Sequence, residues 1–224
     1  MLPFTGGLEA QENGAFLLSA AAALLYAFII DLKPSVIRSV VKTLSTALLA
    51  YLAWRAGGTM LLVAGLALGS LGDLFLSRDG EKAFLAGLAS FLAAHLAYIK
   101  LFAENSLGLA ELDVAYWRLT AMAVVVVFAM SFLVVLLKRA PPTLRLPIVA
   151  YTLTIMAMGV TSLAVANVWV MIGAALFIAS DALLAWERFV SPAISSARPL
   201  MRRAVWVLYY AAQLLIMLGF VLVR

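Results

Sequence analysis

The sequence predicts an all-α membrane protein, a polytopic bundle of eight transmembrane helices. Of the 224 residues, 66% are hydrophobic and 12% are charged, whereas soluble domains are about 45–50% apolar. Apolar stretches recur along the whole chain, each near the roughly 20 residues that an α-helix needs to cross a bilayer. The alternation of apolar and polar residues that is typical of a membrane β-barrel is not present. Helices also satisfy their own backbone groups, which lipid cannot do.

The chain, residues 1–224, is expected to form a single transmembrane domain. Turn-forming sequences such as "DLKPS", "RAGGT" and "SRDGEK" separate the spans. The shortest break is a single asparagine, Asn167. No basic segment precedes the first span, which is therefore predicted to be a retained helix and not a cleaved signal. The expected helices, in chain order, cover residues 14–31, 35–54, 58–77, 82–102, 114–138, 146–166, 168–187 and 203–223.

Loop charges predict the orientation of the chain in the membrane. Placing successive loops on alternate sides puts eleven lysines and arginines on one face and four on the other. The positive-inside rule then makes the first face cytoplasmic and places both termini outside. The net charge of +5 reflects this topology and contacts with lipid head groups, so no nucleic-acid partner is expected. The first group is Lys33, Arg38, Arg78, Lys82, Lys138, Arg139, Arg145, Arg188, Arg198, Arg202 and Arg203; the second is Arg55, Lys100, Arg118 and Arg224.

Three short segments recur at a nearly constant offset and predict an internal repeat. "KTLSTALLAYLA" from Lys42 is similar to "YTLTIMAMGVTSLA" from Tyr151, and "GDLFLS" is similar to "SDALLA". "AAHLAYI" likewise resembles "AAQLLIM". Four helices per repeat preserve orientation, so the expected arrangement is a parallel 4+4 repeat with halves 14–102 and 114–223.

Polar residues inside the spans lie at similar depths. Counted from the loop cations at 1.5 Å per residue, Lys42, Asp73 and Asp181 lie about 8–12 Å below the basic face. A carboxylate exposed to lipid costs about 2.5–3.5 kcal/mol, so both aspartates must face the bundle interior or water. We therefore expect a shared polar pocket nearer the cytoplasmic face. Its other candidate members are His95, Tyr98, Tyr151, Tyr209, Tyr210 and Gln213.

Each candidate also has a purely structural interpretation. Asp73 can form a structural ion pair with Lys42, and Lys42 can extend to the membrane interface. His95 and the tyrosines can be interhelical contacts. Two carboxyl groups in different surroundings can instead hold different protonation states, which suits acid–base hydrolysis without a metal. The absence of cysteine and the single histidine argue against a zinc site, and no cofactor is expected.

The segments "SLGDLFLS…FLAGLASFLAAHLAYI", "FIASDALLAWERF" and "YYAAQLLI" resemble the lysoplasmalogenase family, also called YhhN-like membrane proteins. The similarity extends from Lys42 through the last helix. The resemblance implies an eight-helix hydrolase that cleaves the vinyl ether bond of lysoplasmalogens, releasing a fatty aldehyde and glycerophosphoethanolamine or glycerophosphocholine. It implies Asp73 and Asp181 as the catalytic pair. The residues that would complete the polar pocket are Lys42, His95, Tyr209 or Tyr210, and Gln213.

The mechanism that this resemblance implies divides the two aspartates into an acid and a base. A neutral aspartic acid protonates the β-carbon of the vinyl ether, and an ionised aspartate stabilises the resulting cation and activates water. Asp73 is taken as the acid. The expected partners are a lysophospholipid substrate and membrane lipids. The alternative is a proton-coupled carrier of a small or lipid-like solute, although no span is interrupted at its centre as carrier helices often are.

Overall fold

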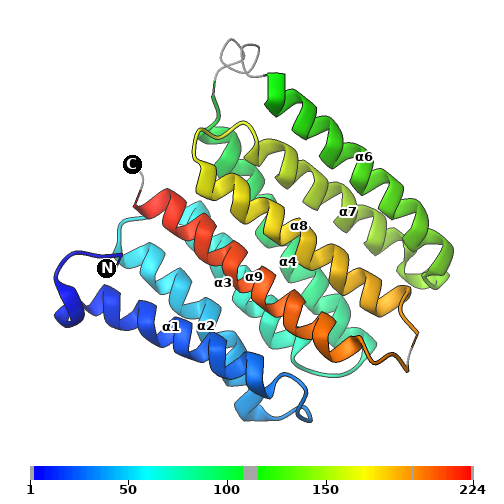
Figure 1. Ribbon diagram of the computed structural model, residues 1–224, viewed down its shortest axis with the longest axis horizontal. Helices are drawn as coiled ribbons and strands as arrows, with labels where there is room; N and C mark the ends of the chain where they lie inside the picture. Colours follow the sequence, from blue (N-terminus) through cyan, green and yellow to red (C-terminus); the bar gives the residue numbers. More distant parts are fainter. Residues whose placement is uncertain (1–2, 108–115, 193, 223–224) are drawn as a thin grey trace.

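The computed structural model describes residues 3–107, 116–192 and 194–222 and confirms the all-α fold (Figure 1). In these ranges a short 3₁₀ helix, η1 (Gly7–Glu9), precedes eight α-helices. Seven of them are long and apolar enough to cross a membrane, and the 17-residue α3 is shorter. The helices are α1 (Gln11–Ile29), α2 (Val36–Arg55), α3 (Met60–Leu76), α4 (Glu81–Glu104), α6 (Tyr116–Arg139), α7 (Pro142–Ser162), α8 (Val168–Phe189) and α9 (Arg198–Val221).

Two helices begin at least four residues earlier than expected from the apolar pattern. Helix α7 starts at Pro142, before the predicted residue 146, and α9 starts at Arg198, before the predicted residue 203. In both cases a proline occupies the first or second helical position, where its missing N–H leaves no hydrogen bond unmade. Charged and proline-containing sequence was therefore mistaken for loop. Residues 114, 115 and 223 of the expected spans, and Arg224, lie outside the described residues.

Helices that follow one another in sequence pack side by side, except α4 and α6, and a few longer-range contacts close the bundle. Helix α9 contacts α1, α2 and α3, while α7 contacts α4. Both termini lie at the same end of the bundle (Figure 1). The eleven basic residues of the charge analysis lie at the opposite end. Lys33 and Arg78 are in loops there, and the other nine are in the helix turns next to the loops. Which end faces the cytoplasm, and whether the two halves are a repeat, stay predictions.

Glycines on one face of α3 give neighbouring side chains access to this helix. A β-carbon at Gly65 would lie 2.5 Å from the Tyr98 ring, and one at Gly69 would lie 2.3 Å from Gln213 Nε2. Gly72 is similarly covered by the ring of Phe91. The spacing of four and three residues places all three glycines on the same side of the helix. Aromatic and amide groups from α4 and α9 therefore pack directly against the α3 backbone.

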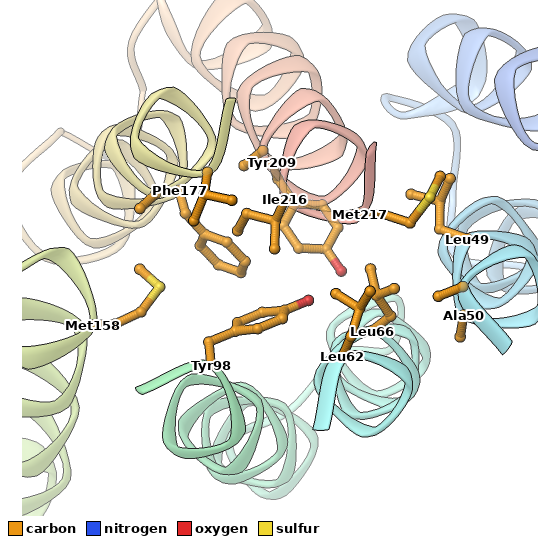
Figure 2. Close-up of a cluster of buried hydrophobic side chains, with 14 of the residues drawn as sticks. Leu49, Ala50, Leu62, Leu66, Tyr98, Met158, Phe177, Tyr209, Ile216 and Met217 are labelled. Carbon is orange, nitrogen blue, oxygen red and sulfur yellow. The ribbon is translucent and has the colours of Figure 1, made fainter. Parts of the chain in front are cut away.

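The main buried core lies between α1, α2, α3, α4, α7, α8 and α9. Figure 2 shows Tyr98 and Tyr209 extending into the middle of this core from different helices. Tyr98 is fully buried and Tyr209 is 4% exposed. The other labelled members are apolar and buried: Leu49, Ala50, Leu62, Leu66, Met158, Phe177, Ile216 and Met217. The two phenol hydroxyls are thus polar groups in apolar surroundings, and each must find a hydrogen-bond partner there.

Candidate active site

Asp73 lies in the last turn of α3 and is surrounded by three donors. Its side chain is only 1% exposed. Lys42 of α2 places Nζ 3.3 Å from Oδ1. The hydroxyls of Thr46 and Tyr209 donate to Oδ2 at 2.8 and 2.9 Å. Both carboxylate oxygens therefore have partners, and one of those partners is a cation.

Lys42 contacts two aromatic rings as well as Asp73. Its Nζ lies 5.7 Å from the ring centroid of Tyr26 and 5.8 Å from that of Trp206. Trp206 is in turn fixed by a 2.9 Å hydrogen bond from its indole N–H to the Ala23 carbonyl oxygen. The ion pair considered in the sequence analysis is thus present. Lys42 reaches the carboxylate instead of extending to the interface.

Asp181 of α8 has a different environment. The hydroxyl of Tyr151, on α7, donates to Oδ2 at 2.5 Å. His95 Nε2, on α4, lies 3.9 Å from the same oxygen and is too distant for a hydrogen bond. In the part of the chain that the structure describes, no lysine or arginine forms an ion pair with Asp181. The neighbours of the Asp181 carboxyl group are therefore a phenol and an imidazole, whereas Asp73 has an ammonium group beside it.

A polar cavity opens at the basic end of the bundle and reaches both aspartates. Its volume is about 580 Å³. Lys42, Asp73, Asp181 and Tyr209 line its inner part. Charged residues of both signs surround the mouth. They are Asp31, Lys33, Arg38, Arg78, Asp79, Glu187, Arg188, Arg198 and Arg202.

A second, apolar chamber of about 80 Å³ lies between α4, α6, α7 and α8. Of the two aspartates, only Asp181 lines it, and Tyr151 lines it as well. Asp181 therefore stands at the junction of the polar cavity and the apolar chamber, whereas Asp73 faces the polar cavity. Hydrocarbon side chains form most of the chamber wall, among them Leu88, Val125, Phe128, Phe132, Ile155 and Ile178.

Four of the predicted pocket residues line neither cavity: His95, Tyr98, Tyr210 and Gln213. His95 is fully buried and packs edge-on against Tyr151 and Phe177. Tyr210 shares a 2.8 Å hydrogen bond with Ser19 of α1. The predicted polar layer therefore separates into residues that face a cavity and residues that lie behind it. Within the described ranges, no three His, Asp or Glu side chains are placed to hold a metal ion.

Sequence reasoning missed Thr46 and Trp206, which contact the Asp73–Lys42 pair. Thr46 follows Lys42 by four residues, and Trp206 precedes Tyr209 by three. Both spacings put two residues on the same face of a helix. Helical periodicity, applied to the residues already singled out, was the signal that could have found both.

The fold and the site define a polytopic helical membrane protein with one buried aspartate facing a polar cavity and a second, partly buried aspartate where that cavity meets an apolar chamber. The sequence profile of the YhhN family matches residues 37–220, and the chain belongs to this family. The family resemblance predicted from the sequence is thereby confirmed.

Several curated relatives carry the same name. The chain is 34% identical to human lysoplasmalogenase TMEM86B over 187 residues, covering 81% of this chain and 74% of the relative. It is 32% identical to mouse lysoplasmalogenase TMEM86B over 211 residues, covering 91% and 84%. It is 30% identical to the lysoplasmalogenase of Mycobacterium bovis over 163 residues, covering 71% and 59%. No solved structure matches the chain.

Proposed function

We propose that this protein is a membrane lysoplasmalogenase, which hydrolyses the vinyl ether bond of a lysoplasmalogen to a fatty aldehyde and a glycerophospho head group. Family membership and the names of its relatives support this activity. The observation that carries it is the position of Asp181 between the polar cavity and the apolar chamber. In a lysoplasmalogen the vinyl ether joins a polar head to a single hydrocarbon chain. A substrate that fills both cavities therefore presents its scissile bond to Asp181.

The basic mouth of the polar cavity is the proposed position of the phosphate. Arg78 and Arg188 line this mouth, and the Arg188 guanidinium lies 4.8 Å from the centroid of the Phe84 ring. Clustered cations next to a membrane attract anionic head groups. By the positive-inside rule this end of the bundle is cytoplasmic. The substrate is then drawn from the cytoplasmic leaflet, and both termini lie on the opposite side.

The surroundings of the two aspartates support distinct roles. The ammonium group of Lys42 and two hydroxyl donors favour the ionised form of Asp73. Asp181 borders the apolar chamber and forms no ion pair with a lysine or arginine of the described residues, and these surroundings favour a neutral carboxylic acid. The single Tyr151 donor has a smaller and opposite effect. We therefore assign Asp181 as the acid and Asp73 as the base, which reverses the assignment that the sequence favoured. The carbon to be protonated belongs to the hydrocarbon chain, which lies on the side of Asp181.

The reaction then balances within the site. Asp181 transfers its proton to the β-carbon of the vinyl ether, leaving an oxocarbenium ion that the Asp73 carboxylate stabilises. A water molecule attacks the cationic carbon while Asp73 accepts one of its protons, and a hemiacetal forms. In the collapse, the Asp181 carboxylate accepts the hemiacetal hydroxyl proton as the C–O bond to glycerol breaks. Asp73 returns its proton to the glycerol oxygen, so both residues regain their starting states.

Deuterium incorporation tests the proposed chemistry directly. Purified protein in detergent is supplied with lysoplasmenylethanolamine in D₂O, and the aldehyde is analysed by mass spectrometry. Protonation at carbon predicts one deuterium on the carbon next to the aldehyde group. Release is expected to be insensitive to EDTA, and the acyl analogue lysophosphatidylethanolamine is expected to yield no aldehyde. Aldehyde release no greater than that of an Asp181→Asn variant would refute the proposed function.

A further inference from the structure

A chain of hydrogen bonds behind Asp73 connects it to two residues that line neither cavity. The Tyr98 hydroxyl, on α4, donates to Gln213 Oε1 on α9. Gln213 Nε2 donates to the Tyr209 hydroxyl oxygen at 3.3 Å. The Tyr209 hydroxyl donates to Asp73 Oδ2 at 2.9 Å. All four residues are at least 96% buried, and Tyr98 and Gln213 face neither the polar cavity nor the apolar chamber.

The chain has a defined direction, because a phenol and an amide differ in what they can donate. With Oε1 accepting from Tyr98, the amide presents its N–H₂ group to Tyr209. The Tyr209 oxygen therefore accepts a proton from the amide, and its own hydroxyl proton is left for Asp73. An amide rotated by half a turn would present Oε1 to Tyr209 and attract that proton away from the carboxylate.

Packing holds the two outer members in place. The Tyr98 ring lies against Gly65 and stacks on Phe102, with centroids 5.9 Å apart. The Gln213 amide lies against Gly69, where a β-carbon would overlap with Nε2. Since neither side chain can shift without displacing its neighbours, the amide orientation depends on the Tyr98 hydroxyl.

We propose that Tyr98 and Gln213 are positioning residues that act through Tyr209 to select which oxygen of Asp73 serves as the base. Thr46 and Tyr209 together occupy both lone pairs of Oδ2. Oδ1, beside Lys42, is then the oxygen that accepts the proton from the attacking water. This inference rests on the proposed function, because it assigns the working atom of the proposed base.

The test compares full-length variants in the vinyl ether assay, with kcat, KM and the melting temperature measured for each. Tyr98→Phe removes the hydroxyl that orients the amide, and Tyr209→Phe removes the group through which it acts. The double variant reports whether the two effects are independent. Ser19→Ala is the matched control, because it also removes a buried interhelical hydroxyl, one that bonds the Ser45 carbonyl oxygen and Tyr210.

Tyr98→Phe is expected to lower kcat about fivefold, the order expected for one misdirected hydrogen bond, with KM changed less than about twofold. Tyr209→Phe is expected to lower kcat more, and the double variant to match Tyr209→Phe alone. Ser19→Ala should lower the melting temperature but leave kcat within about twofold of the wild type. Gln213→Met, which keeps the shape and removes both amide bonds but leaves the Tyr209 hydroxyl on Asp73, should behave like Tyr98→Phe.

Two results would overturn the positioning role while leaving the proposed function standing. One is a double variant whose loss is the product of the single losses. The other is a kcat for Tyr98→Phe and Gln213→Met no lower than for Ser19→Ala. A folded wild-type protein that releases no aldehyde would instead refute the proposed function, and the positioning role with it.

Discussion

Asp73 and Asp181 are chemically identical side chains in contrasting surroundings. Asp73 contacts an ammonium group and two hydroxyl donors at the inner part of a polar cavity. Asp181 accepts one phenol hydrogen bond, lies 3.9 Å from a histidine nitrogen and borders an apolar chamber. Neighbours of this kind separate the protonation states of paired carboxyl groups. A base and an acid can therefore be made from the same residue by changing only what packs around it.

The side chains that distinguish the surroundings of the two aspartates occupy equivalent positions in the predicted repeat. Each aspartate is contacted by a side chain from the helix that precedes its own, Lys42 on α2 and Tyr151 on α7. These are also the positions that the repeat aligns with each other. In the proposed mechanism, a cation at one of them and a phenol at the other distinguish the base from the acid.

The largest expected effect is the loss of either carboxyl group. Asp181→Asn and Asp73→Asn each remove a proton-transfer group, so we expect kcat to fall by about 10³-fold in both, within the range that general acid–base catalysis supplies. Aldehyde release from lysoplasmenylethanolamine is the measurement. Glu12→Gln is the control, since its ion pair with Arg55 involves residues that line neither cavity. Near-normal turnover in both Asn variants would contradict the proposed roles of Asp181 as the acid and Asp73 as the base.

Replacing Lys42 tests whether its positive charge keeps the proposed base, Asp73, ionised. Lys42→Met leaves the Asp73 carboxylate buried without its cation, which should destabilise the protein by about 3–5 kcal/mol. We expect kcat to fall by about 10²-fold, because Asp73 then becomes protonated and cannot accept a proton from water. Thermal unfolding should show that Lys42→Met/Asp73→Asn regains most of the lost stability. A double variant no more stable than Lys42→Met would mean that the ion pair is not the source of the effect.

A bulky side chain in the apolar chamber tests whether the substrate's hydrocarbon chain lies there, next to the proposed acid Asp181. Ala182 lines the apolar chamber next to Asp181. Ala182→Trp should raise KM about tenfold for a long-chain substrate, equivalent to about 1.4 kcal/mol of lost binding. An analogue with a chain of only a few carbons should be affected less. Equal changes for the two substrates would show that the hydrocarbon chain does not occupy this chamber.

The smallest expected effect belongs to the single hydrogen bond on Asp181. Tyr151→Phe removes the phenol hydroxyl but keeps the ring that packs on His95. We expect kcat to fall about three- to tenfold with KM nearly unchanged, since one donor orients the acid but does not carry the proton. Steady-state kinetics alongside Lys42→Met give the comparison. A loss as large as that caused by Lys42→Met would contradict the assigned roles.

Much of the fold could be predicted because lipid imposes strong constraints. Apolar spans of membrane length identified the eight helices, and the errors of four and five residues at α7 and α9 arose where prolines and cations begin a helix. The common depth of Lys42, Asp73 and Asp181 anticipated that they line one cavity. Depth follows from counting residues along a helix, because the rise per residue is constant.

The sequence by itself determined the class of fold, the family and the positions of the polar residues along their helices, since hydropathy and helix length depend only on local order along the chain. The tertiary structure alone decided which residues face a cavity. His95 and Gln213 lie at suitable depth but behind the cavity walls, whereas Thr46 and Trp206 are in contact with the Asp73–Lys42 pair. It also placed Asp181 beside the apolar chamber and Lys42 beside Asp73. Which side chains face a cavity depends on how each helix is rotated about its axis. Packing against the neighbouring helices sets that rotation.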